Sequence, residues 1–344
     1  MEGSLPWAVF VLSAVAVGFS GWHLARQGDR ISGQTGLGGL WVGVILIASA
    51  TSLPEIITNI SAVAIDEPNL AAGNLFGSSM ANMLILAVID LMHRRKRVLQ
   101  TISQGQGLVA MLAIALTVMA AAFIVSESPL AIGHVGIETL VLALVYLFGA
   151  RLVLSQEYVD ALARIAAKAG RDDAGEMRPR EEPRLRMPER ETVLLFLAAA
   201  AVIVVAGPLL AISAEGISNQ TGIEESFVGV LFLATATSLP ELLSSISAVR
   251  LGAHDLAIGN LFGSNCFNMA AFVVIDFAYT PGPIFDAVDQ ADVVAALVAV
   301  FLMATAMMGV MYRAERRHWF LEPDAAAIII AYGFGLLMVY DATT

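Results

Sequence analysis

The sequence is poor in charged residues and contains almost no cysteine. Charged side chains make up 14% of its 344 residues and hydrophobic ones 58%, whereas soluble domains carry roughly a quarter charged residues. The single cysteine, Cys266, excludes a disulfide framework and a thiolate metal site. The five histidines form no HExxH pair, and no Walker A loop is present. These absences argue against a zinc hydrolase and against transport driven directly by ATP.

What the sequence does contain is a series of apolar runs, each about the length needed to cross a bilayer. They predict spanning helices over residues 6–26, 37–65, 70–91, 104–125, 133–154, 192–212, 223–251, 256–279, 288–312 and 324–341. The N-terminus lacks a positively charged leader, so we expect the first run to remain as a spanning helix. The predicted fold is all-α and integral to the membrane, with ten transmembrane helices.

The second half of the chain repeats the first. "GNLFGSSMAN" at 73–82 returns as "GNLFGSNCFN" at 259–268, and residues 51–90 match 237–276 at 22 of 40 positions without a gap. The predicted units are 1–154, with its motif at about 48–90, and 192–344, with its motif at about 234–276. Residues 155–191 form a polar linker whose first half has the pattern of a surface helix.

The basic residues predict how the two units are oriented. All 19 Lys and Arg residues fall in alternate loops, including the linker, and none lies at either terminus. By the positive-inside rule these loops are cytoplasmic and both termini face out. A five-helix unit is odd, so the second copy is inverted relative to the first. Inverted repeats are typical of secondary transporters, whose site lies at the repeat interface near the bilayer midplane.

Each unit places a proline and a glutamate in the middle of its second helix. The segment "ATSLPE" occurs at 50–55 and again at 236–241. Pro54 and Pro240 should kink or break their helices, which frees backbone carbonyls at the midplane. Glu55 and Glu241 follow directly, and a charged side chain at that depth requires a partner or a function. No basic residue is predicted at that depth, so a bound cation is the simplest partner, with protonation as the competitor.

The repeated decamer supplies further oxygen donors. Ser78 and Asn82 lie four residues apart on one helix face, as do Ser264 and Asn268. The GxxxG glycines should let this face approach the broken helix that carries Thr51, Ser52 and Glu55. Carboxylates, hydroxyls, amides and freed carbonyls are ligands for hard cations, and they suit Ca²⁺ better than Mg²⁺. Asp90 and Asp276, a further repeat pair, are expected to be solvated at helix ends.

These paired motifs resemble the two α-repeats of the cation/Ca²⁺ exchanger superfamily, closest to its sodium/calcium exchanger branch. The resemblance implies that Glu55 and Glu241 are central ligands shared by Ca²⁺ and Na⁺, and that the first and sixth helices slide to open the site to alternate sides. It further implies a ligand set completed by Thr51, Ser52, Thr237, Ser238, Ser78, Ser264, Asn82, Asn268 and the carbonyls of Ala48 and Ala234. The chain departs from the family in having Ala50 and Ala236 before the Thr-Ser pairs, asparagine at both central positions, and Ser79 where the second copy has Asn265.

The expected function is therefore Na⁺/Ca²⁺ antiport by alternating access, with an H⁺/Ca²⁺ antiporter on the same scaffold as the alternative. We expect a transporter rather than an enzyme, because no histidine or lysine base accompanies the serines. No cofactor and no nucleic acid partner is expected; the partners are Ca²⁺, Na⁺ and the lipid bilayer. The predicted location is the plasma or inner membrane, with multiple spans. Acidic loop residues such as Glu67 and Glu225 are interpreted as solvated, with cation attraction at the outer mouth as the alternative.

Overall fold

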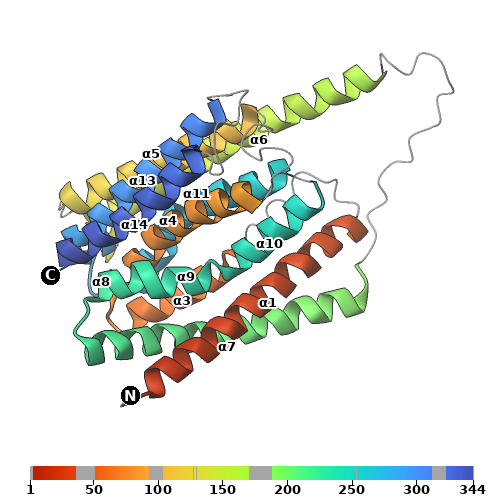
Figure 1. The fold of residues 1–344 in the computed structure, drawn as a ribbon. Coiled ribbons are helices and arrows are strands. Elements are labelled where there is room, and N and C mark those ends of the chain that lie inside the picture. Colours follow the sequence, from red (N-terminus) through yellow and green to blue (C-terminus); the bar gives the residue numbers. More distant parts are fainter. Residues whose placement is uncertain are drawn as a thin grey trace.

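The computed structural model describes residues 3–35, 51–92, 104–126, 128, 130–169, 188–252, 254–311 and 323–343. The first half contains α1 (Leu5–Thr35), α3 (Leu53–Ala64), α4 (Pro68–Met92), α5 (Gln104–Ser126), β1 (Ala131–Ile132), β2 (Val135–Gly136) and α6 (Ile137–Ala169). The second contains α7 (Arg190–Thr221), α8 (Glu225–Val228), the π-helix η2 (Gly229–Leu233), α9 (Ala234–Thr237), α10 (Leu239–Arg250), α11 (His254–Ala278), α12 (Ile284–Ala287), α13 (Gln290–Met311) and α14 (Pro323–Thr343). The long helices run roughly side by side, and both termini lie at the same end of the bundle (Figure 1).

The helices have the length and apolarity of membrane spans. Within the described ranges, eight helices could each cross a bilayer, and a ninth span results if the bent pair Glu225–Thr237 and Leu239–Arg250 is counted as one. The expected all-α membrane fold is thus confirmed. The predicted run 37–65 lies partly outside the described residues, so the count of ten spans and the outward orientation of both termini stay predictions.

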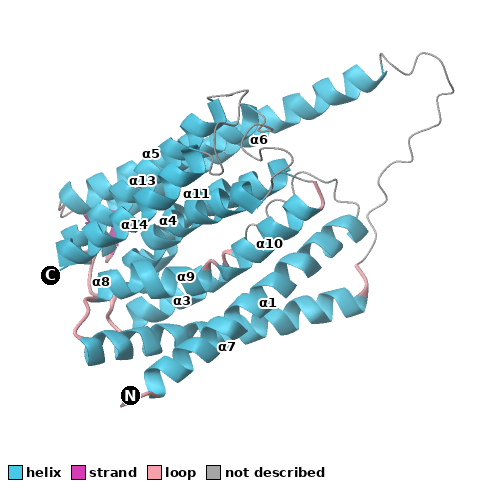
Figure 2. Ribbon diagram, viewed as in Figure 1, coloured by secondary structure: helices cyan, strands magenta, loops and turns pink. Residues whose placement is uncertain are grey.

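A break in the second repeat's long helix occurs where the proline predicted it. Helix α9 ends at Thr237 and α10 begins at Leu239, with a bend of 43° between them (Figure 2). Ser238 joins them at φ −82°, ψ 4°. Pro240 is the second residue of α10, where a helix needs no backbone donor. In the first repeat Ser52 has nearly the same conformation, φ −89°, ψ 1°, at the start of α3.

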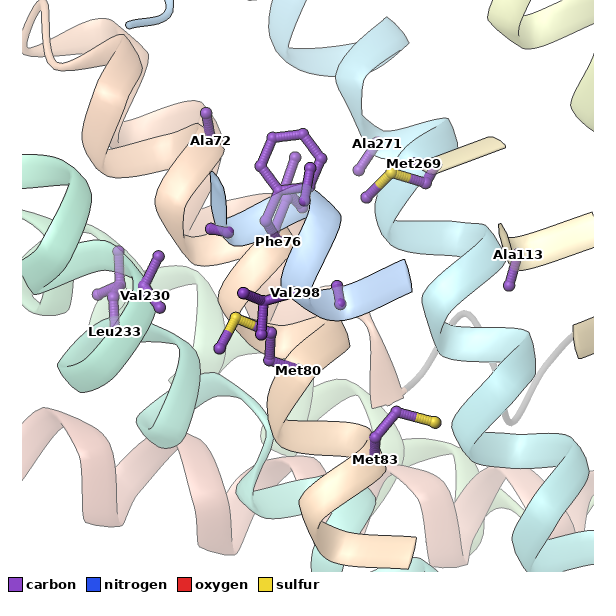
Figure 3. Close-up of a cluster of buried hydrophobic side chains, with 14 of the residues drawn as sticks. Ala72, Phe76, Met80, Met83, Ala113, Val230, Leu233, Met269, Ala271 and Val298 are labelled. Atoms are coloured by element: carbon purple, nitrogen blue, oxygen red, sulfur yellow. The ribbon is translucent and has the colours of Figure 1, made fainter. Parts of the chain in front are cut away.

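Two helices, α4 and α11, form the centre of the bundle and are the helices that contain the repeated decamers. Large side chains in the middle of α4, among them Phe76 and Met80, are fully buried. Phe76 packs on Phe272 of α11, with ring centroids 5.3 Å apart. Figure 3 shows the α4 side chains beside residues of the neighbouring helices: Val230 and Leu233 of η2, Met269 and Ala271 of α11, Val298 of α13 and Ala113 of α5. This apolar packing holds the polar faces of α4 and α11 in place.

Two expectations near the helix ends are wrong. The predicted span 133–154 begins later, at Ile137, because residues 131–136 form an antiparallel hairpin in which Ala131 pairs with Gly136. Asp90 and Asp276, expected to be solvated, are 2% and 0% exposed. The Asp276 carboxylate accepts hydrogen bonds from the Gly136 amide at 2.9 Å, the Ile284 amide at 2.7 Å and the Thr139 hydroxyl. It therefore fastens the hairpin and α12 to the end of α11.

The linker prediction is only partly covered by the structure. Helix α6 continues through Ala169, well beyond the apolar part of its sequence. The first half of the predicted linker is thus helical, as the extension of α6 that projects from the bundle (Figure 1). Residues 170–187 lie outside the described ranges, so the linker boundary at 155–191 stays a prediction.

Candidate cation site

The two repeated glutamates lie together in the interior. Glu55 is in the first turn of α3 and Glu241 is in the first turn of α10, directly after each break. Their exposed fractions are 2% and 1%, and the carboxylates are close enough to repel each other. Each occupies a helix N-terminus, where free backbone amides favour negative charge. The two copies of the repeated sequence thus bring two acids close together, and no basic side chain among the described residues lies against either of them.

Each glutamate is accompanied by a threonine from the other repeat. Thr237 lies beside the Glu55 carboxylate, and Thr51 lies beside that of Glu241. Both threonines are completely buried. Because the pairs cross between repeats, neither half of the chain can form this centre alone.

Several oxygen atoms at the centre have no partner within the described part of the chain. They are Glu55 Oε2, Glu241 Oε2, Ser52 Oγ, Ser238 Oγ and Asn82 Oδ1. Buried polar atoms are normally hydrogen-bonded, and those that are not require an explanation such as a bound ion. The Ala234 carbonyl, another predicted donor, already accepts from the Ser238 amide at 3.0 Å and the Thr237 hydroxyl at 3.4 Å. Ala48 lies outside the described residues.

The predicted donors of α4 and α11 are also buried, although they differ in their contacts. Ser264 donates to Glu241 Oε1 at 3.3 Å within its own repeat. Ser78, its counterpart, contacts Thr237 Oγ1 at 3.3 Å across the repeat interface. Asn82 and Asn268 are 1% and 2% exposed and reach across between α4 and α11. All the predicted donors that the structure describes are buried, and the contacts between α4, α10 and α11 link the two halves.

The GxxxG glycines of α4 pack against a different helix from the one we expected. A side chain at Gly73 would collide with the Ser226 carbonyl, and one at Gly77 with the backbone of Val230. The glycines of α4 therefore allow close approach to α8 and η2 of the second repeat, rather than to the broken helix of their own repeat. For Gly73 and Gly77 the expectation of close packing is confirmed and that of its partner is wrong. In the second copy a side chain at Gly259 would meet the Gln106 side chain, and one at Gly263 would meet no described atom within 4 Å.

Two asparagines that sequence reasoning missed support this centre. Asn74 Oδ1 accepts from the Thr237 hydroxyl at 3.1 Å and from that of Ser78 at 3.4 Å. Its Nδ2 donates to Asn59 Oδ1 at 2.7 Å. The signal was available, because Asn74 and Asn260 belong to the duplicated "GN" pair. Asn59 carried no such signal, since Ser245 stands at the matching position.

The donor set consists of oxygen atoms and contains only two carboxylates. No group of three or more His, Cys, Asp or Glu residues suited to a metal ion occurs within the described ranges. A cation here would be held by two carboxylates, hydroxyls and amide oxygens, which suits a hard ion of moderate affinity.

A second set of acids lies nearer one end of the bundle. We call it the acidic end: Asp66, Glu67, Glu215 and Glu225. Partial burial, together with the repulsion from Glu225, Glu215 and Asp66, raises the pKa of Glu67 to about 7. Most of its negative charge is therefore present above pH 7 and lost below it.

Comparison with known families and proteins agrees with this arrangement. The model of the family described as sodium/calcium exchanger protein matches residues 5–167 and 191–340. Inner membrane protein YrbG of Escherichia coli is 28% identical over 285 residues, which is 81% of this chain and 82% of that protein. Sodium/calcium exchanger MaX1 of Methanosarcina acetivorans is 22% identical over 280 residues, 75% of this chain and 79% of that protein.

The fold is also similar to that of a solved exchanger. A structure of the sodium-calcium exchanger NCX_Mj superimposes with a TM-score of 0.59 and 18% sequence identity. The superposition covers 97% of this chain and 98% of that one. The similarity in fold therefore extends over both halves of the chain.

Proposed function

The chain belongs to the sodium/calcium exchanger protein family, and from that premise we propose that it exchanges Na⁺ for Ca²⁺ at the centre formed by Glu55 and Glu241. Family membership makes it a membrane cation/Ca²⁺ exchanger rather than an enzyme. The observation that carries the proposal is the pair of buried carboxylates from opposed repeats, surrounded by oxygen donors. Thr51, Ser52, Thr237, Ser238, Ser78, Ser264, Asn82 and Asn268 are the proposed further ligands, with the carbonyls of Ala48 and Ala234.

Charge balance explains why such a site would exchange ions. Two ionised glutamates give the site a charge of −2, which one Ca²⁺ or two Na⁺ neutralise. Without a bound ion, the change of access would leave both carboxylate charges uncompensated in the low-dielectric interior, at a cost of several kcal/mol. The loaded forms avoid that cost, so net movement requires one ion to replace the other. Three Na⁺ for one Ca²⁺ would move one net charge, which a membrane potential drives at about 2.3 kcal/mol per 100 mV.

The same proposal includes the arrangement of the whole chain. Residues 1–154 and 192–344 act as inverted five-helix units joined by a cytoplasmic linker at 155–191. Both termini face out from a plasma or inner membrane. The packing of α1 along α7, apart from the central helices (Figure 1), supports a role for these two helices as the moving pair.

Transport by the purified protein in liposomes tests the proposal. Vesicles are loaded with Na⁺ and diluted into Na⁺-free buffer containing labelled Ca²⁺; matched vesicles contain an inside-acid pH gradient instead. We expect uptake driven by the Na⁺ gradient and none driven by the pH gradient alone. Uptake driven only by protons would assign H⁺/Ca²⁺ antiport, which the asparagines at both central positions would accommodate. If neither gradient moves Ca²⁺ through folded protein, the proposed substrate is wrong.

A further inference from the structure

A chain of hydrogen bonds between α4 and α11 orients the two central asparagines. Asn82 Nδ2 donates to Asn265 Oδ1 at 2.8 Å, and Asn265 Nδ2 donates to the Ser79 carbonyl at 3.4 Å. Asn268 Nδ2 approaches Ser79 Oγ at 3.4 Å, and that hydroxyl donates to the Leu75 carbonyl at 3.0 Å. Ser79 and Asn265 are completely buried. They occupy the same position of the repeat, directly after "GNLFGS", where the first copy has serine and the second has asparagine.

The direction of this chain follows from its two ends, which are backbone carbonyls. A carbonyl oxygen can only accept, so the end of Asn265 that faces the Ser79 carbonyl must be its NH₂ group. The other end of Asn265 is then an oxygen, and Asn82 must offer its own NH₂ to it. The oxygen of Asn82 is thereby turned away from the chain, and it is one of the buried atoms without a partner within the described ranges.

The same reasoning applies to Asn268. The Ser79 hydroxyl has one proton, which it gives to the Leu75 carbonyl one turn earlier. Toward Asn268 the hydroxyl can therefore only accept, so Asn268 must present NH₂ to it. Its oxygen is turned away from Ser79. Each NH₂ group thus faces the neighbouring helix, and each amide oxygen is turned away from that contact.

We propose that Ser79 and Asn265 are positioning residues that hold the Asn82 and Asn268 amides with their oxygens toward the bound cation. This inference rests on the proposed function, because it explains how the same site keeps the amide NH₂ groups away from the ion. An unrestrained amide could turn its NH₂ group toward the cation, where the partial positive charge would be repelled. Residues behind the ligands of metal sites typically change affinity about 10–100-fold when removed.

The test is a double-mutant comparison of Ca²⁺ binding. Asn265→Leu is made in the wild-type chain and in an Asn82→Asp chain, and the Ca²⁺ dissociation constant of each purified protein is measured by titration calorimetry. An aspartate presents an oxygen whichever way it turns. We therefore expect Asn265→Leu to weaken Ca²⁺ binding about tenfold in the wild type and to have little or no effect when residue 82 is aspartate. Equal losses in both backgrounds would show a general structural role and overturn the inference.

A second pair of variants keeps the test decisive if Asn265→Leu does not fold. Ser79→Ala removes the hydroxyl that accepts from Asn268, and one lost hydrogen bond corresponds to about fivefold weaker Ca²⁺ binding. The loss should disappear when residue 268 is aspartate. Cys266→Ala is the matched control, because Cys266 is the next residue on α11 and its sulfur faces the Val109 carbonyl of α5 instead. Unchanged binding in both Asn265→Leu and Ser79→Ala overturns the proposal, whereas a wild-type chain that binds no Ca²⁺ overturns the proposed function itself.

Discussion

Each half of the chain has a glycine at the same repeat position, but the two glycines contact different levels of the helices against which they pack. Gly21 of α1 and Gly207 of α7 are 186 residues apart and are repeat mates. A side chain at Gly21 would meet the ring of Pro240, the residue before Glu241. The repeat would place Gly207 against Pro54. Instead, a side chain at Gly207 would meet Ile57 at 2.8 Å and Thr58 at 3.2 Å.

The offset between these contacts corresponds to about one helical turn. Ile57 lies three residues beyond Pro54, and at 1.5 Å per residue that is about 5 Å along α3. One sequence unit is thus present in two arrangements within one molecule. If the halves exchanged arrangements, Gly21 would move toward the residues after Glu241 and Gly207 would move to Pro54. Such an exchange would shift α1 and α7 past the site in the way that alternating access requires.

The sharpest test of equivalence between the halves is the removal of one carboxylate charge at a time. We expect Glu55→Gln and Glu241→Gln each to reduce Ca²⁺ uptake by roughly 100-fold or more, because breaking a buried charge balance costs about 3–5 kcal/mol. Initial rates of labelled Ca²⁺ uptake into liposomes measure the effect. Glu138→Gln, at the start of α6, is the control for the loss of a buried acid away from the centre. Normal uptake by either central variant would show that the half-sites do not share one ion.

The glycine contacts predict a smaller effect that differs between the halves. In Gly21→Ala the new methyl group meets the rigid ring of Pro240, and such overpacking costs about 1–3 kcal/mol. In Gly207→Ala the methyl group meets the Cγ2 methyl of Ile57 at 2.8 Å and the Thr58 hydroxyl at 3.2 Å, which are looser contacts than the one between Gly21 and the Pro240 ring. We expect the maximal Ca²⁺ transport rate to fall about tenfold in Gly21→Ala and about twofold in Gly207→Ala. Equal losses would indicate that the offset between α1 and α7 has no bearing on transport.

The sequence predicted the site more completely than it predicted the contacts that differ between the halves. Glu55 and Glu241 could be placed close together because the duplication and the prolines give each copy the same broken helix with a glutamate directly after the break. The helix break at Ser238 followed from Pro240 in the same way. These features depend on local chemistry that both copies share.

Contacts that depend on how the copies interlock could not be predicted. The partner of Gly73 is the Ser226 carbonyl of the other repeat, and nothing in the decamer distinguishes it from a helix of the same repeat. Asp276 was expected in solvent because it lies near a helix end, yet the hairpin at 131–136 folds over it. Its burial depends on a contact with residues about 140 positions earlier, for which no sequence pattern was available.

The acidic end offers the smallest predicted effect, and it concerns a residue that only one half possesses. Glu67 has Ala253 as its repeat mate, and its pKa is raised to about 7. The carboxylate is mostly charged at pH 8 and mostly neutral at pH 6. One added negative charge near a cation path, screened by salt, should raise the initial rate of Ca²⁺ uptake from that end about twofold.

The pH profile separates this charge from any proton coupling at the centre. We expect wild type and Glu67→Gln to transport alike at pH 6, and wild type to be about twofold faster at pH 8 at low salt. The advantage should disappear at high ionic strength, because screening removes attraction at the surface and leaves the buried centre unaffected. A difference between the two proteins that persists at high salt, or that appears at pH 6, would assign Glu67 a direct contact with the ion instead of a long-range attraction. In that case the acidic end would contain a ligand of the ion, and the opposite end of the bundle would lack its counterpart.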